Sequence, residues 1–76
     1  IEAIFSFLEG MGYVSAYHQK TGELLGEESR ATYYHRFNEN SPFFLDYTFS
    51  NIAIKSYALC EWDKEVSDHV AQMIEL

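Results

Sequence analysis

Two short segments in the second half of the chain carry residues suited to acid–base chemistry. Asp46 lies within the apolar run 43–49, where a buried carboxylate needs a partner in order to stay ionised. Asp68 and His69 are adjacent, just before the last apolar stretch. A carboxylate that accepts a hydrogen bond from one imidazole nitrogen fixes the ring tautomer and makes the other nitrogen a better base. We expect Asp46 and His69 to form such a pair; the simpler alternative is an edge strand whose Asp46 points to solvent.

Zinc binding is a second chemical interpretation of the polar residues. The candidate ligands are the three histidines and the single cysteine, namely His18, His35, His69 and Cys60. No two of them have the short sequence spacing of structural zinc sites. Unrelated polar residues are therefore the better interpretation, with Cys60 a buried thiol. The acidic pair Glu27–Glu28 beside Arg30 indicates a solvated loop.

The aromatic residues allow a further interpretation, in which exposed rings stack on nucleobases. Tyr33, Tyr34 and Phe37 are close enough in sequence for this role, but aromatic residues on a small sheet more often belong to the core or to an interface. Trp62 precedes Asp68 and His69 in the chain, where it either lines a pocket or covers the end of the core. We expect it to cover the core.

Composition indicates one small folded domain over residues 1–76. Nearly half of the residues, 47%, are apolar, and the net charge is −7. Twelve acidic residues against five basic ones repel nucleic-acid phosphates, so binding driven by charge alone is disfavoured. No apolar run approaches the roughly 18 residues that span a bilayer, and a single cysteine fits a reducing compartment, so we expect a cytoplasmic protein.

The elements that position these residues follow from periodicity. Apolar residues at helical spacing, followed by glycines, predict a helix over residues 1–9. Alternation predicts a strand over 13–18, and the segment 24–30 is expected to be a loop with one helical turn. A strand over 32–37 should then continue through the polar turn 38–42 into an antiparallel partner over 43–50.

Two further strands are expected in the last third. In the run 52–60, the residues at even positions form one face, Ile52, Ile54, Ser56, Ala58 and Cys60, while Lys55, Tyr57 and Glu61 form the other. The final strand over 70–76 has a shared face of Val70, Gln72, Ile74 and Leu76. A short N-terminal helix followed by a mostly antiparallel sheet defines an α+β fold.

Taken in order, these motifs resemble a known family. Thr32-Tyr33-Tyr34, a polar turn, the run 44–49 containing Asp46-Tyr47, and then Ser67-Asp68-His69 with a closing apolar strand are similar to the C-terminal third of the endonuclease/exonuclease/phosphatase superfamily. Bacterial members also resemble the stretch 12–18 and the loop 26–28, so the likeness spans most of the chain.

The resemblance implies a Mg²⁺- or Mn²⁺-dependent hydrolase of phosphoesters, built as an α/β/β/α sandwich of two sheets. In that family the residue matching His69 contacts the scissile phosphate, the one matching Asp46 orients it, and the one matching Asp68 lies beside the metal. A positioned imidazole would stabilise charge on the phosphoryl oxygens in the transition state. Phosphorylated substrates or nucleic acid are expected as partners on this analogy alone.

The chain also departs from the family. The family commonly has proline two residues after the histidine, and here that position is Ala71. The family's N-terminal asparagine, its metal-binding glutamate and its Asp-x-Asn pair have no counterpart in this sequence. We therefore expect a fragment without turnover, either lacking an N-terminal half or pairing as a homodimer through an uncovered apolar sheet face. The alternative is a small non-catalytic interaction domain that keeps the family's strand pattern.

Overall fold

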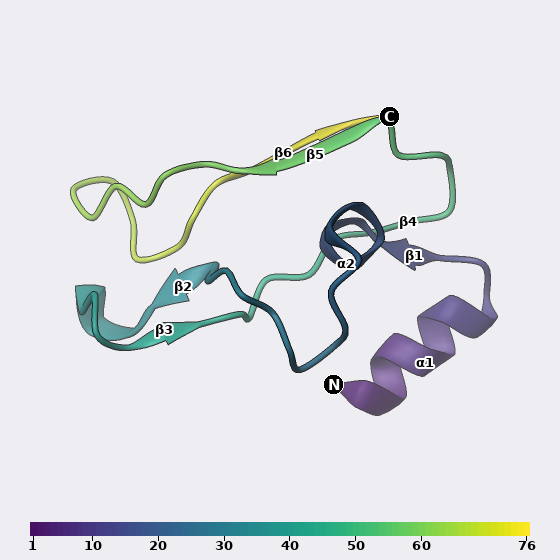
Figure 1. The fold of residues 1–76 in the computed structure, drawn as a ribbon, viewed down its shortest axis with the longest axis horizontal. Coiled ribbons are helices and arrows are strands. Elements are labelled where there is room, and N and C mark those ends of the chain that lie inside the picture. Colours follow the sequence, from purple (N-terminus) through teal and green to yellow (C-terminus); the bar gives the residue numbers. More distant parts are fainter.

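The chain folds into three short antiparallel ribbons, with two helices near one end (Figure 1). This architecture is seen in a computed structural model that describes residues 1–76 in full. The elements in chain order are α1 (Glu2–Gly10), β1 (Val14–Ser15), α2 (Ala16–Thr21), β2 (Tyr33–Tyr34), the 3₁₀ turn η1 (His35–Phe37), β3 (Pro42–Phe43), β4 (Phe49–Ser50), β5 (Ser56–Leu59) and β6 (Gln72–Glu75). Strand β1 pairs with β4, β2 with β3, and β5 with β6. The α+β class is confirmed.

Helix α1 matches the predicted helix to within one residue at each end. Phe5 is its buried residue, and its ring meets Phe49 and His18 edge-on, with centroids 5.4 Å apart in both pairs. The chain leaves the helix through Gly12, which has a φ of 88° in the left-handed region. The helix therefore packs against β4 and α2, as its apolar spacing requires.

The predicted strand over 13–18 is wrong after Ser15, because helix α2 begins at Ala16. Ala16 and Tyr17 are both buried, and two successive buried residues do not fit a strand with only one face covered. Gly22 ends the helix with a φ of 76°. The helical turn expected within 24–30 is absent, and the helix lies just upstream instead.

The ribbon β2–β3 confirms the predicted turn but shortens both of its strands. Tyr33 pairs with Phe43, and the strand then gives way to η1, where Arg36 and Phe37 have positive φ values of 53° and 58°. The expected partner strand over 43–50 is broken into β3 and β4. Asp46 therefore lies between two strands rather than inside one.

The face predicted for the run 52–60 holds at Ile54, which is buried, and at Cys60, which is half-buried, but it is reversed within β5. Tyr57 and Leu59 are half-buried, whereas Ser56 and Ala58 are exposed. The Tyr57 hydroxyl donates to the side-chain oxygen of Gln72 over 2.8 Å, which holds the odd-numbered face inward.

Strand β6 keeps the predicted face in part. Gln72 and Ile74 are half-buried and Val70 is buried, but Leu76 is 55% exposed. Because Leu76 follows the last paired residue, Glu75, the ribbon no longer holds its side chain against the core. The inward face of this ribbon therefore runs from Val70 to Ile74.

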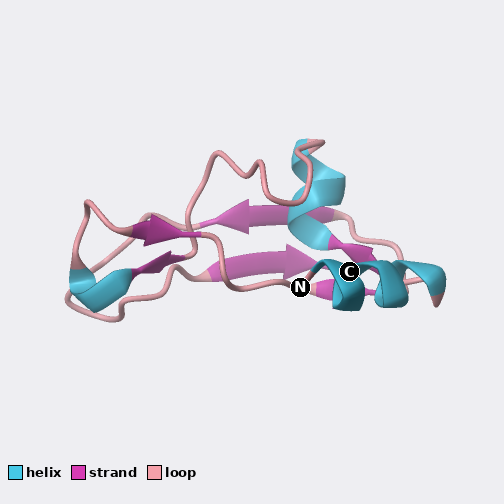
Figure 2. Cartoon of the chain, turned by 90° about the horizontal axis from the view of Figure 1, so that it is seen from below, coloured by secondary structure: helices cyan, strands magenta, loops and turns pink.

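The core is small and the molecule is flat. Seven residues are buried, namely Phe5, Ser15, Ala16, Tyr17, Thr32, Ile54 and Val70. The molecule measures 36 × 26 × 17 Å along its principal axes, and its thin profile is visible in Figure 2. None of the helices has the length and apolar character that crossing a membrane requires.

Candidate functional site

Asp46 and His69 form the pair that the sequence predicts. The Asp46 Oδ2 and His69 Nδ1 atoms are 2.7 Å apart, although the residues are 23 positions apart in the chain. The His69 side chain is 48% exposed and the Asp46 side chain 35%. No protein group bonds the second ring nitrogen, Nε2. A hydrogen bond to the carboxylate on one side of the ring and solvent on the other leaves Nε2 able to exchange a proton with a ligand.

The segment that carries His69 is held against β2. The Tyr34 amide donates to the Asp68 carbonyl over 2.8 Å, and Tyr33 forms an isolated antiparallel bridge with His69. The His69 amide in turn donates to the Ser67 hydroxyl over 3.0 Å. Residues 68–70 therefore run antiparallel beside residues 32–34 without forming a strand of their own, and this places the imidazole beside Asp46.

Asp68 lies next to the pair but takes no part in it. Its backbone carbonyl accepts the Tyr34 hydrogen bond, while its half-buried side chain forms neither an ion pair nor a hydrogen bond. No three His, Cys, Asp or Glu side chains gather anywhere in the chain so that they could hold a metal ion. By themselves the residues of this chain do not fit a complete Mg²⁺ or Mn²⁺ site, so Asp68 as a metal ligand stays a prediction.

Tyr33, considered above as a stacking ring, borders the pair, and His35 contacts Tyr33 but neither member of the pair. The Tyr33 ring lies 4.8 Å from the His69 ring between centroids, and the Tyr33 hydroxyl is 3.1 Å from His35 Nδ1. His35 follows β2 at the start of η1, two positions after Tyr33. The strand alternation of positions 33 and 35 is the one signal that could have indicated their contact.

Trp62 stacks on a neighbouring ring and also lines a cavity with Tyr34 and Cys60, so each of its two expected roles is seen in part. Its ring stacks on Tyr34 at 4.0 Å between centroids and 14° between planes, and its indole N–H donates to the Ser67 carbonyl over 2.9 Å. Tyr33 and Tyr34 therefore serve different neighbours, and the two do not form one stacking surface with Phe37. The indole hydrogen bond ties Trp62 to Ser67, two residues before His69.

A second histidine pair, His18 with Glu28, was not expected from the sequence. His18 Nε2 is 2.6 Å from Glu28 Oε2, His18 Nδ1 is 2.7 Å from the Ser15 hydroxyl, and the paired side chains are only 8% and 7% exposed. Burial opposes ionisation of Glu28, but hydrogen bonds from His18 and the Gly26 amide outweigh it, and the pKa of Glu28 falls below its usual value.

This pair corrects the interpretation of Glu28 as a solvated residue. It also keeps His18 apart from the other candidate zinc ligands, since both ring nitrogens are occupied. Ser15 is 4% exposed and occupies the position before helix α2. The Ser15–His18–Glu28 chain therefore ties α2 to the following loop and offers no accessible nucleophile.

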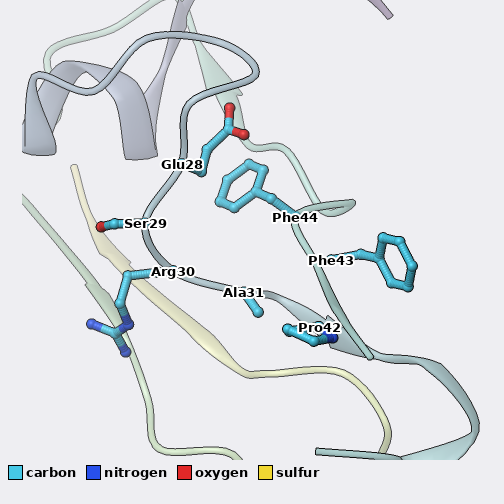
Figure 3. A pocket seen from close by; sticks show the side chains of 7 residues that line it. All are labelled: Glu28, Ser29, Arg30, Ala31, Pro42, Phe43 and Phe44. Atoms are coloured by element: carbon cyan, nitrogen blue, oxygen red, sulfur yellow. The ribbon is translucent and has the colours of Figure 1, made fainter. Parts of the chain in front are cut away.

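A cavity of about 290 Å³ beside the loop that carries Glu28 does not contain the Asp46–His69 pair. Its lining consists of Glu28, Ser29, Arg30, Ala31, Pro42, Phe43 and Phe44. Figure 3 shows the Phe44 ring next to the Glu28 carboxylate, while the side chains of Phe43 and Arg30 point away in different directions. Its polar groups do not converge on one point, so the exposed Asp46–His69 pair remains the better candidate site.

Comparison with protein-family models, with curated proteins and with solved structures finds no match to this chain.

Proposed function

We propose that this chain is the C-terminal part of a phosphoester hydrolase of the endonuclease/exonuclease/phosphatase type. In this proposal it supplies the imidazole that contacts the phosphate and the carboxylate that orients the imidazole. The observation that carries the proposal is the 2.7 Å hydrogen bond between Asp46 and His69 with Nε2 left open to solvent. The order of motifs around these two residues supports the same reading of the site.

The chemistry assigned to this chain is limited to binding and orientation. With the Asp46 carboxylate on Nδ1, a protonated His69 donates from Nε2 to a phosphoryl oxygen and stabilises the charge that develops there. The water-positioning and metal-binding groups of the family are absent from the sequence, so no step is assigned to a metal ion. We expect the 76-residue chain with Mg²⁺ to hydrolyse a phosphodiester no faster than a His69→Ala variant.

The first test is a titration with inorganic phosphate at mildly acidic pH, followed by NMR of the histidine ring resonances. We expect His69 resonances to move saturably. Replacing Asp46 by Asn should weaken phosphate binding by about tenfold, because the ring loses a charge-assisted hydrogen bond.

Another exposed imidazole provides the matched control. His35→Gln removes a histidine that is exposed but lies outside the pair, so the variant should bind phosphate as the wild type does. If phosphate leaves His69 unmoved, or moves His35 and His69 equally, the proposed phosphate contact is wrong.

A non-catalytic interaction domain is the second candidate function. It is favoured by the number of large apolar side chains on the surface, which include Ile4 at 60% and Phe7 at 64% exposure on α1 and Met11 at 61% just after it. Under this alternative, the Asp46–His69 pair is a surface hydrogen bond without a ligand. The phosphate titration separates the two candidates.

A further inference from the structure

Thr32 is the most completely buried polar side chain of the molecule, with 0% of its surface exposed. Its hydroxyl oxygen accepts two backbone hydrogen bonds, from the Leu45 amide over 2.9 Å and from the Asp46 amide over 3.0 Å. A hydroxyl oxygen has two lone pairs, so both are used here. The Thr32 hydroxyl thereby fixes the backbone after β3 at Asp46, the residue whose carboxylate bonds to His69.

The backbone of Thr32 fixes the other half of the site. Its carbonyl accepts a hydrogen bond from the Val70 amide over 2.7 Å, next to His69 in the chain. Its amide donates to the Phe43 carbonyl over 2.9 Å, at the end of β3. One buried residue therefore bonds directly to both chain segments that meet in the Asp46–His69 pair, although 24 residues separate Asp46 from Val70 by sequence number.

We propose that Thr32 is a positioning residue, whose hydroxyl holds Asp46 at hydrogen-bonding distance from His69 and thereby keeps Nδ1 protonated and Nε2 available. The expected effect of Thr32 on phosphate binding rests on the proposed function, whereas its effect on the His69 tautomer is independent of that function. Asp46 has no other protein group holding its backbone amide, and the segment 44–48 lies outside the strand ladders. Ring packing of Phe44 and Tyr47 against His18 holds the flanks of this segment, but the Thr32 hydroxyl is the group that bonds to the backbone of Asp46 itself.

The test compares Thr32→Val with Thr32→Ser. Valine keeps the shape of threonine but leaves the two amides without an acceptor, whereas serine keeps the hydroxyl. NMR correlation of the imidazole nitrogens and carbon-bound protons reports which ring nitrogen is protonated in neutral His69. We expect Nδ1–H in the wild type and in Thr32→Ser, and a shift towards Nε2–H in Thr32→Val.

A second threonine provides the matched control for the loss of a hydroxyl. Thr48 is half-buried, and its hydroxyl donates to the Gln72 side chain over 3.4 Å and bonds to neither Asp46 nor His69. Thr48→Val should leave the His69 tautomer unchanged. If Thr32→Val does not fold, as judged by the dispersion of its amide spectrum, Thr32→Cys replaces it, because sulfur is a weak acceptor of similar size.

Phosphate titration of the same variants distinguishes positioning from a general loss of stability. Thr32→Val should weaken phosphate binding by about tenfold in the wild-type background but produce little further loss in Asp46→Asn, because both changes act through one pair. A folded Thr32→Val or Thr32→Cys variant with unchanged His69 tautomer overturns the positioning role. If Thr32→Val changes the His69 tautomer but the wild type binds no phosphate, the positioning role is supported and the proposed function is wrong.

Discussion

The molecule has two histidine–carboxylate pairs with nearly equal N–O distances, 2.6 Å and 2.7 Å, but they differ in whether a ring nitrogen remains unbonded. In the His18–Glu28 pair both ring nitrogens are bonded and the side chains are almost fully buried. In the His69–Asp46 pair one ring nitrogen is bonded and about half of the imidazole surface meets solvent. The same two residue types therefore make a structural tie in one place and a candidate ligand contact in the other, and exposure decides between them.

The carboxyl group of Glu23 should make folding stability sensitive to acid. Hydrogen bonds from the Ser29 hydroxyl, the Tyr17 hydroxyl and the Ser29 amide lower its pKa from 4.5 to about 2. A depressed pKa in the folded state adds stability above pH 4.5 that is lost as the pH falls towards 2. We expect the free energy of unfolding of the wild type, measured by urea denaturation followed by circular dichroism, to fall as the pH drops from 4.5 towards 2.

The variant Glu23→Gln isolates this contribution. It should flatten the fall in stability between pH 4.5 and about 2, whereas Glu27→Gln, at an exposed neighbour without a side-chain hydrogen bond, should not. An unchanged acid dependence in Glu23→Gln would mean that the Ser29 and Tyr17 contacts do not stabilise the ionised carboxylate in solution.

Among the helices and strands, those whose formation depends on neighbouring residues could be predicted from the sequence. The apolar spacing of α1, the polar turn over 38–42 and the alternating face of β6 are all visible in neighbouring residues, and the structure has them. Helix α2 was missed because its six residues are too few to show a helical period, and alternation over 13–18 imitated a strand. The face of β5 depends on Tyr57 reaching Gln72, a contact across 15 residues.

The candidate site was predictable only in part for the same reason. Asp46 and His69 could be paired because their types and order suggest it. The role of Thr32 has no local signal, since its hydroxyl acts on residues 13 and 14 positions away. The buried state of Glu28 likewise depends on His18, ten residues earlier.

The end of helix α2 offers a test of how backbone conformation limits the sequence. Gly22 has a φ of 76°, whereas Gly10, at the end of α1, has no positive φ, and an added Cβ meets nothing within 4 Å at either position. Gly22→Ala should lower the free energy of unfolding by about 1 kcal/mol, because alanine is strained in the left-handed region. Gly10→Ala, the control, should raise it by a few tenths of a kcal/mol.

Urea denaturation monitored by circular dichroism measures both effects. Equal shifts of the two midpoints would indicate that Gly22 leaves the left-handed conformation in solution. The comparison is independent of side-chain packing, since open space surrounds both positions.

At the scale of the whole molecule, the surface is larger than a chain of this mass requires. The exposed area is 5347 Å², whereas about 4,800 Å² follows from the usual scaling for a folded monomer of 8.9 kDa. A second copy of this chain would cover some of this additional exposed area. The outer side of the β5–β6 ribbon is a candidate face, because it carries Met73 at 65% exposure above a shallow hollow of the two strands.

We expect sedimentation equilibrium at micromolar concentration to show a dimer. Met73→Glu should shift the protein towards monomer, since a charge on the outer face opposes its burial. Val66→Glu, which adds the same charge at a loop residue that is 80% exposed, should leave the dimer intact. A well-folded wild-type monomer would contradict this expectation.

The hydrogen bond between the Thr32 carbonyl and the Val70 amide has a consequence for the order of folding. It joins residues 38 positions apart, while the β2–β3 and β5–β6 ribbons close over shorter stretches of chain. Long loops close more slowly because more chain entropy is lost before any contact forms. The two ribbons should therefore form first, and Asp46 should meet His69 only when they dock. In amide exchange the Val70 proton would then report the docking of the ribbons separately from the formation of either one.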